Sequence, residues 1–445
     1  MRDYVLTAVI FGVLPVCFFR PWIGVIVWYW FGFMNPHRLT WGFAYSMPFA
    51  VLIGGATLAG LLITRDRKPI PWDAGLVLVA MLTAYFTFTT FFAWAPEDAW
   101  LEWKKIVKVI LMTFVATTLI FGRDRIRALM FTIALSIGFY GFKGGIYGLG
   151  GGYRVEGPPG SFIDGNTFIG LAFCMVLPVI ICLAREEQRR WLKGFLYATA
   201  ALTFVATIFT FSRGAYLALA VVTSLVFMRA KKRLIAVALL LPLLTIGPYL
   251  LPDRVYDRAG MIENYQQDGS ANARLQSWTV AWNIAKDLPL TGAGLQFEYA
   301  RDAARWASYG DSELKWAVRT SSAAHSIYFQ VLGQHGFVAF TLFVLLLLTT
   351  LVRLQKIITA AQRLPNTAWL GNYALALQTG FVGYMVAGAF LSSAYFDLVY
   401  LYIALTAIFA RELRVAQTEA QTVVISASES EFAGASPVQS GLGVR

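Results

Sequence analysis

The stretch that decides the fold is residues 323–353, which read AAHSIYFQVLGQHGFVAFTLFVLLLLTTLVR. A mostly apolar run of this length crosses the ~30 Å hydrocarbon core of a bilayer as a helix. The chain has 445 residues, of which 58% are hydrophobic and 14% are charged. A soluble domain is about one-quarter charged. The sequence therefore predicts an all-α polytopic membrane protein.

Working outward from that segment, the apolar runs predict about twelve spans. They cover residues 4–34 (broken near Pro15 and Pro21), 46–63, 73–93, 105–121, 126–142, 166–184, 193–211, 213–230, 234–251, 323–353, 368–391 and 396–411. The basic residues gather in short loops on one side, as the positive-inside rule expects of cytoplasmic loops. If residues 4–34 cross once, both termini lie on that side. A complete hairpin there would move only the N-terminus to the opposite side.

This topology divides the chain into four parts. They are residues 1–251 with nine spans, a large periplasmic loop at 252–322, three further spans at 323–414, and a disordered cytoplasmic tail at 415–445. Within the loop, residues 272–287 predict a cap helix with Leu275, Trp278 and Trp282 on one face. The segment 143–165 is too rich in glycine and proline for a regular helix.

Charge and motifs exclude several classes of function. The net charge of +12 does not indicate nucleic-acid binding, because the basic residues lie in short loops beside the membrane. Cys17, Cys174 and Cys182 lie inside apolar runs, with no disulfide or metal spacing. The outer side carries no carboxylate or His/Cys motif with metal-ligand spacing, and the chain has no Walker motif. We therefore expect neither a metal nor another cofactor.

Three polar residues are the candidates for chemistry. Arg213 opens a span on the side that disfavours arginine, and a helix N-terminus already attracts anions. Its guanidinium can bind phosphate in a bidentate manner, or it can simply reach the lipid headgroups. Arg274 lies on the cap helix, where a solvated surface arginine is the alternative. His325 begins the longest span, where it can accept a proton near neutral pH or serve as a hydrogen-bonded structural histidine.

Further side chains are expected near the same place. The candidates for a shared pocket are Lys143, Tyr147, Arg154 and Tyr328. The first three come from the glycine-rich segment, where a flexible lid or an interfacial contact is an equally good reading. Tyr328 would share a helical face with His325. His335 lies deeper in the same span, and we expect it to pack or form hydrogen bonds.

Taken in order, these positions resemble the superfamily of O-antigen ligases and Wzy polymerases. The matching pieces are Ser212-Arg213-Gly214, Arg274 with Trp278 and the turn Pro289 to Gly294, and Ala324-His325-Ser326 followed by Gly336. The resemblance covers residues 160–410, approximately. The segments 153–158 and 160–162 are also similar to a subgroup of O-glycosylation ligases associated with exosortase systems. Ser326 stands where many members carry asparagine.

The resemblance implies a fold like that of the C-type glycosyltransferases. It implies an O-antigen ligase in the bacterial inner membrane that transfers a glycan from undecaprenyl diphosphate to a lipid A-core sugar at the periplasmic face. Arg213 and Arg274 would bind the diphosphate without a metal, and His325 would be the general base of an inverting transfer. The implied partners are the lipid-linked glycan, the lipid A-core acceptor and membrane lipids.

Other functions stay open. Within the same enzyme class, the chain can be a Wzy-type O-antigen polymerase or a ligase that modifies protein Ser or Thr. A flippase or another transporter of lipid-linked oligosaccharides belongs to a different class, and so does a non-catalytic scaffold. Transporters often show inverted repeats and charged residues near the membrane midplane. This sequence shows no such repeat, and its unusual polar residues cluster at one face.

Overall fold

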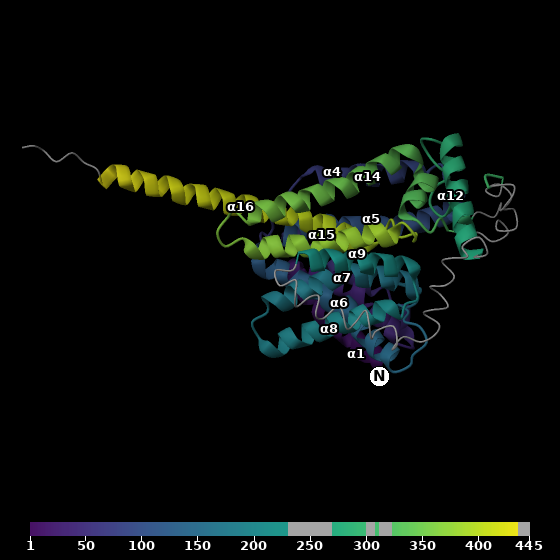
Figure 1. Cartoon of the computed structure of the whole chain (residues 1–445), viewed down its shortest axis with the longest axis horizontal. Coiled ribbons are helices and arrows are strands. Elements are labelled where there is room, and N and C mark those ends of the chain that lie inside the picture. Colours follow the sequence, from purple (N-terminus) through teal and green to yellow (C-terminus); the bar gives the residue numbers. More distant parts are fainter. Residues whose placement is uncertain (230–268, 300–307, 311–322, 435–445) are drawn as a thin grey trace, which may run out of the picture.

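The computed structural model describes residues 1–229, 269–299, 308–310 and 323–434 (Figure 1). The predicted span 234–251 and most of the loop 252–322 lie outside these residues. The α-helices are α1 Arg2–Phe19, α2 Pro21–Met34, α3 Phe49–Ile63, α4 Ala74–Thr90, α5 Pro96–Leu119, α6 Gly122–Leu149, α7 Gly165–Glu186, α8 Arg190–Ile208, α9 Arg213–Met228, α12 Gly269–Asp287, α14 Ile327–Ala361, α15 Ala368–Gly388 and α16 Asp397–Gly434. Short 3₁₀ helices cover Pro36–Leu39, Phe43–Tyr45 and Phe297–Tyr299.

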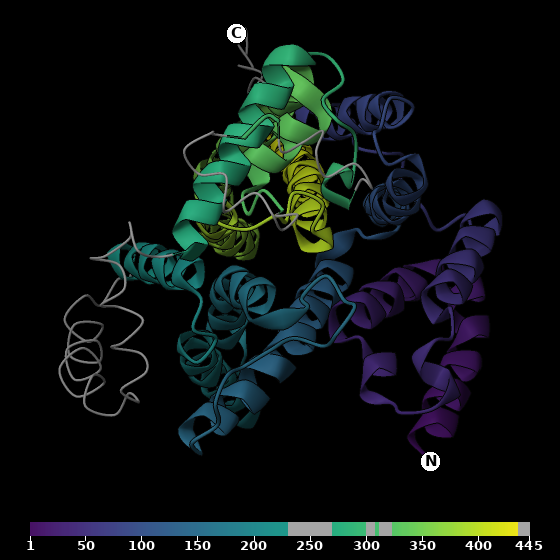
Figure 2. The ribbon, with the colours of Figure 1, turned by 90° about the vertical axis from the view of Figure 1, so that its right-hand side faces the viewer.

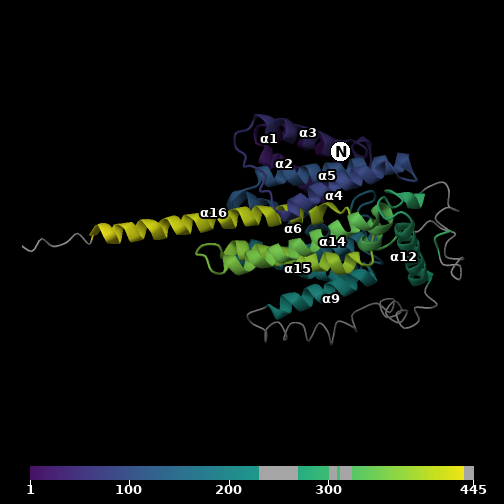
Figure 3. The ribbon, with the colours of Figure 1, turned by 90° about the horizontal axis from the view of Figure 1, so that it is seen from above.

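The helices confirm a helical membrane protein. Among the described helices, α1, α6, α7, α8 and α14 are five that are long and apolar enough to cross a membrane. Four shorter apolar helices, α2, α3, α4 and α9, accompany them. Seen from above, most of these helices run side by side, while α12 stands across one end of the bundle (Figure 3). The number of spans and the C-type arrangement remain predictions.

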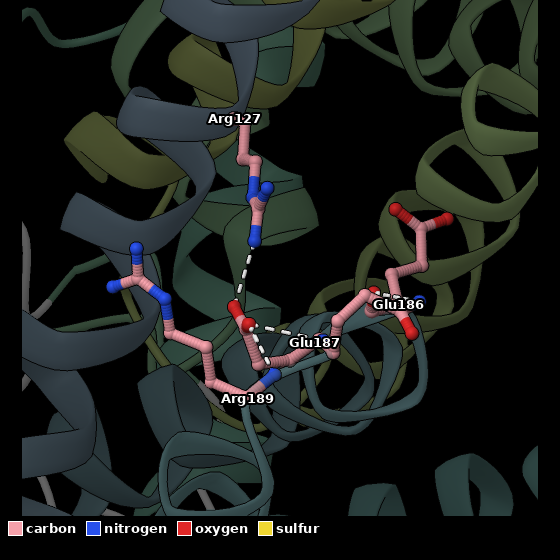
Figure 4. Close-up of polar contacts among 5 residues, drawn as sticks. Arg127, Glu186, Glu187 and Arg189 are labelled. Atoms are coloured by element: carbon pink, nitrogen blue, oxygen red, sulfur yellow. Dashed lines mark hydrogen bonds and ion pairs between the residues drawn. The ribbon is translucent and has the colours of Figure 1, made fainter.

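Contacts between the connecting segments define the two ends of the bundle. We call one the basic end; it comprises residues 64–73, 119–127, 185–190 and 362–372. There Arg125 pairs with Asp66 at 2.5 Å, and Arg127 pairs with Glu187 at 2.7 Å. The Glu187 carboxylate also accepts the backbone N–H groups of Gln188 and Arg189 (Figure 4). The predicted basic loops thus meet in space.

We call the opposite end the site end; it comprises residues 34–45, 91–96, 150–165, 209–213, 288–294 and 389–396. The N-terminus lies here, because the Asp3 carboxylate accepts the N–H groups of Gly42 and Ala44 at 3.0 and 3.1 Å. Helices α1 and α2 therefore form a complete hairpin that reverses at Pro21, whose ring supplies no N–H to α1 but can start α2. Of the two alternatives for residues 4–34, the structure shows the hairpin, so the N-terminus lies at the end opposite the basic one.

The tail also differs from its prediction. Helix α16 continues from the bundle past residue 415 to Gly434, and Figure 1 shows it projecting well beyond the basic end. Residues 415–434 are therefore helical, where disorder was expected. The sequence contains runs of good helix formers between the weaker Ser and Gly positions, and propagation from an existing helix avoids the cost of nucleation.

The glycine-rich segment corrects another expectation. Helix α6 extends to Leu149, so residues 143–149 are regular helix. The glycines in this stretch bring α6 close to α8: a Cβ on Gly145 would lie 2.4 Å from the Leu202 carbonyl oxygen, and one on Gly148 would meet the Phe209 ring at 2.6 Å. Small residues permit such close approach of helices in membranes. The glycine content of this segment alone does not distinguish a close contact between helices from a loop.

We expect Gly145→Ala to lower the thermal stability of the protein in detergent. The added methyl must displace backbone of α8, and overpacking of this kind costs about 1–3 kcal/mol. Gly194→Ala in α8 is the matched control, because a Cβ there has nothing within 4 Å. Both changes favour the helix, so the difference between the two melting curves isolates packing. Equal melting temperatures would contradict the tight α6–α8 contact.

Candidate active site

A turn at Pro289–Gly294 fastens the site end to α14. Gly336 interrupts α14 with φ 74° and ψ −171°. The backbone there bonds to the turn instead: Phe337 N–H donates to the Pro289 carbonyl at 2.8 Å, and the Gly333 carbonyl accepts from Ala293 at 2.9 Å. A side chain at Gly336 would place its Cβ 2.3 Å from the Pro289 oxygen. The turn and Gly336 together therefore hold this segment firmly against α14.

Helix α12 ends just before this turn and lies across the end of α14 (Figure 2). The prediction of a helix is confirmed, and the structure adds which of its residues are buried. Leu275 and Trp282 are exposed, whereas Val280, Ala281 and Ile284 are buried. Small side chains face inward because α12 comes close to Gly333, where an added Cβ would lie 2.9 Å from the Ala281 methyl. Trp282 stays at the periphery.

His325 lies just before α14 and not within it. Its φ of 44° is in the left-handed region, and Ser326 is the N-cap of the helix. The expectation that His325 shares a helical face with Tyr328 is therefore wrong. Trp278 of α12 donates to the Ala324 carbonyl at 2.7 Å and stacks on Phe329 with ring centroids 5.0 Å apart. These contacts dock the cap helix directly on the histidine segment.

Arg274 and His325 are close enough to interact. Burial, followed by the positive charge of Arg274, lowers the pKa of His325 below its ordinary value. Its imidazole is therefore neutral at neutral pH and has a lone pair that can accept a proton. The two residues are 51 positions apart in sequence, and the docking of α12 is what brings them together.

Arg213 approaches from the opposite flank of α15. It is the first residue of α9, behind the N-cap Ser212, whose hydroxyl accepts the Ala215 N–H at 3.3 Å. A Cβ on the next residue, Gly214, would lie 3.3 Å from Phe390 at the C-terminal end of α15. One on Gly388, two residues earlier, would meet Ile327 at 2.8 Å. The last turn of α15 therefore contacts the neighbours of both Arg213 and His325.

The other predicted pocket residues divide between two places. Lys143, Tyr147 and Arg154 line a cavity of about 340 Å³ together with Arg38. Arg154 also pairs with Glu156, which lines the same cavity. Tyr328 does not join them; its hydroxyl donates to the Met385 carbonyl of α15 at 3.3 Å. Arg38, from the 3₁₀ helix after α2, was not among the pocket residues predicted from the sequence.

His335 confirms its prediction as a hydrogen-bonding residue. It is fully buried, its Nδ1 lies 2.5 Å from the Thr89 hydroxyl, and its Nε2 lies 2.8 Å from the Tyr395 hydroxyl. The sequence reading missed the polar residues that continue from it, Gln330 and Gln334. Their spacing of four residues inside an apolar span was the available signal, since polar residues in spans are expensive and face the interior.

Comparison with known families places the three central residues in one domain. Residues 198–344 match the O-antigen ligase family, and residues 1–188 match a family of unknown function (DUF5935). No curated protein matches the chain. The first match includes Arg213, Arg274 and His325, and it confirms the resemblance to the O-antigen ligase superfamily. Membership of the exosortase-associated subgroup stays a prediction.

Proposed function

We propose, because residues 198–344 match the O-antigen ligase family, that the protein transfers a glycan from undecaprenyl diphosphate to a sugar of the lipid A core. The observation that carries the proposal is the placement of Arg274 beside a neutral, half-buried His325 at the end of the bundle where Arg213 opens α9. The site would face the periplasm from the inner membrane, since the opposite end is the basic one.

Each residue has a role in the proposed reaction. The acceptor hydroxyl oxygen attacks the anomeric carbon, and the bond from that carbon to the diphosphate oxygen breaks. His325 takes the hydroxyl proton as the general base. Arg213 and Arg274 stabilise the negative charge that grows on the departing undecaprenyl diphosphate. Direct attack inverts the anomeric configuration, and the activated leaving group makes ATP unnecessary.

The cavity formed by Arg38, Lys143, Tyr147 and Arg154 fits a supporting role. Three cations face one carboxylate, Glu156, so the cavity favours an anion. It lies at the site end, in the part of the chain that matches the family of unknown function. We propose that it holds the phosphate of a membrane lipid or of the lipid acceptor. Tyr328 would support the His325 segment by tying α14 to α15.

Reconstituted protein tests the proposal. We expect purified protein in nanodiscs to transfer glycan from undecaprenyl diphosphate to lipid A core without ATP or added metal, as measured by mass spectrometry of the product. Parallel reactions contain donor alone, or a Ser/Thr-bearing acceptor peptide. Longer lipid-linked glycan from donor alone would identify a polymerase instead, and a glycosylated peptide would identify a protein ligase. Movement of donor across the bilayer without any transfer would indicate a flippase.

A further inference from the structure

A second cavity, of about 260 Å³, lies beside the His325 segment. Its wall includes Ala323, two residues before His325, and Gln330 in the first turn of α14. Residues from the loop before α7 and from the segment after α15 complete it, among them Phe162 and Ser393. The volume is just below the roughly 300 Å³ at which small-molecule pockets usually begin. It therefore suits a single small ring.

The wall offers neutral and acidic hydrogen-bonding groups with aromatic faces between them. Glu102, Asp164 and Glu298 supply carboxylates, and Gln330 supplies an amide. The Oε1 atom of Gln330 accepts the Ala394 N–H at 3.1 Å, so its NH₂ group is the part left to donate. Among the described residues, no three or more His, Cys, Asp or Glu side chains are grouped as ligands of one metal ion. The carboxylates are instead spread around the wall.

One side of this wall is held by a chain of hydrogen bonds. The Tyr395 hydroxyl donates to Gln334 Oε1 at 2.6 Å, so it must accept from His335 Nε2, which lies 2.8 Å away. The series fixes the side chain of Gln334, which lines the cavity together with Glu298. Gln334 favours the charged form of the Glu298 carboxyl group.

Ser393 supplies an independent observation. It is only 5% exposed, and its hydroxyl has no hydrogen-bond partner within the described part of the chain. Its backbone is already engaged, because its N–H donates to Leu391 at 3.0 Å and its carbonyl accepts from the Tyr384 hydroxyl at 3.1 Å. A buried hydroxyl without a partner costs about 1–3 kcal/mol. A ligand hydroxyl in the cavity would remove that cost.

We propose that this cavity is a carbohydrate subsite that binds one sugar ring of a glycan substrate. Amides and carboxylates match the alternating donors and acceptors of sugar hydroxyls, while Phe162 and its neighbours can cover the apolar face of a ring. The three acidic groups would repel a diphosphate, so the subsite complements the arginines of the proposed active site. Burial raises the pKa of Glu298 to about 7, so this group can both donate to and accept from a hydroxyl.

The identification of the ring as part of a reacting substrate rests on the proposed function. The sugar can belong to the lipid-linked donor or to the acceptor. Because Ala323 lies two residues before His325, a ring held there would lie near the His325 segment. The subsite would therefore determine which glycans the protein accepts, and the test separates sugar binding from transfer.

The key variant is Ser393→Ala, which removes only the hydroxyl of this residue. Binding of methyl hexosides and methyl N-acetylhexosaminides to the full chain in nanodiscs is measured by saturation-transfer NMR titration. We expect the wild-type protein to bind at least one of these glycosides. Ser393→Ala should weaken that binding about 3- to 10-fold, the effect of one neutral hydrogen bond, without lowering the melting temperature. Glu298→Gln should weaken it by a similar factor, because the amide NH₂ replaces a carboxyl oxygen that can accept from a sugar hydroxyl.

The matched control is Ser136→Ala. Ser136 in α6 is also buried with a partnerless hydroxyl, but it is not part of this wall. Its variant should bind glycosides like the wild type. Failure of the wild type to bind any glycoside, or equal binding by the Ser393→Ala and Ser136→Ala variants, would overturn the subsite.

Transfer kinetics then identify the sugar. A higher KM of Ser393→Ala for the donor assigns the ring to the lipid-linked glycan, and a higher KM for the acceptor assigns it to the lipid A core. A change in neither would contradict a role in substrate binding. If the wild-type protein transfers no glycan at all, the proposed function fails, while the glycoside titration still decides the subsite.

Discussion

His325→Ala is expected to reduce glycan transfer by about 10²- to 10⁴-fold, the usual contribution of a general base. The imidazole lies outside the regular part of α14, so its loss should leave the helix and the docking of Trp278 on Ala324 intact. The melting temperature should change little. The rate of product formation by the purified variant, with saturating donor and acceptor, is the measurement.

His37→Ala is the control, because His37 also lies at the site end but stacks on Phe31 with ring centroids 4.7 Å apart. It should retain transfer.

The pH dependence of kcat/KM provides a second check. A protonated His325 cannot act as the general base, so kcat/KM should fall as the pH is lowered through the pKa of this residue. Because that pKa is lowered, the fall should occur below about pH 6.5. Wild-type transfer by the His325→Ala variant would remove this residue from the mechanism.

Arg213→Ala should reduce the rate of transfer by about 10²- to 10³-fold, as the loss of one group that stabilises developing charge commonly does. The guanidinium adds its charge to a helix N-terminus that already attracts anions. Arg213→Lys keeps the charge but loses the bidentate geometry, so we expect it to recover only part of the rate. Product formation and the affinity for undecaprenyl diphosphate should fall together.

Arg190→Ala is a matched control, because Arg190 is the first residue of α8 as Arg213 is of α9. Arg190 is exposed at the basic end, so its removal should leave transfer unchanged. A comparable loss of activity in both variants would mean that the effect comes from helix stability or lipid contact, and it would argue against phosphate binding by Arg213.

Sequence patterns predicted the features that depend on local order. Apolar runs gave the helical membrane class, and periodicity gave the helix at 272–287. The prediction failed where packing decides. The glycines of 143–149 form helix because α8 approaches them closely. The face that α12 buries lies against Gly333, and periodicity alone does not identify it.

In the candidate site too, local sequence predicted some features and packing determined the others. Arg213 was found because arginine is unusual at that end of a span, and His325 because histidine is rare in this chain. The positive φ of His325 was not predictable, since no local sequence signal at this position indicates a left-handed conformation. Glu298 and Ser393 come from segments about a hundred residues apart, and only the folded chain places them in one cavity.

The most direct test of the central claim is an electron cryo-microscopy structure of the full chain with undecaprenyl diphosphate bound. The claim is that Arg213, Arg274 and His325 act on one substrate at the site end. We predict that both guanidinium groups contact the diphosphate and that His325 faces the open acceptor side. A diphosphate bound only among Arg38, Lys143 and Arg154, with His325 directed into a separate cavity, would contradict the account.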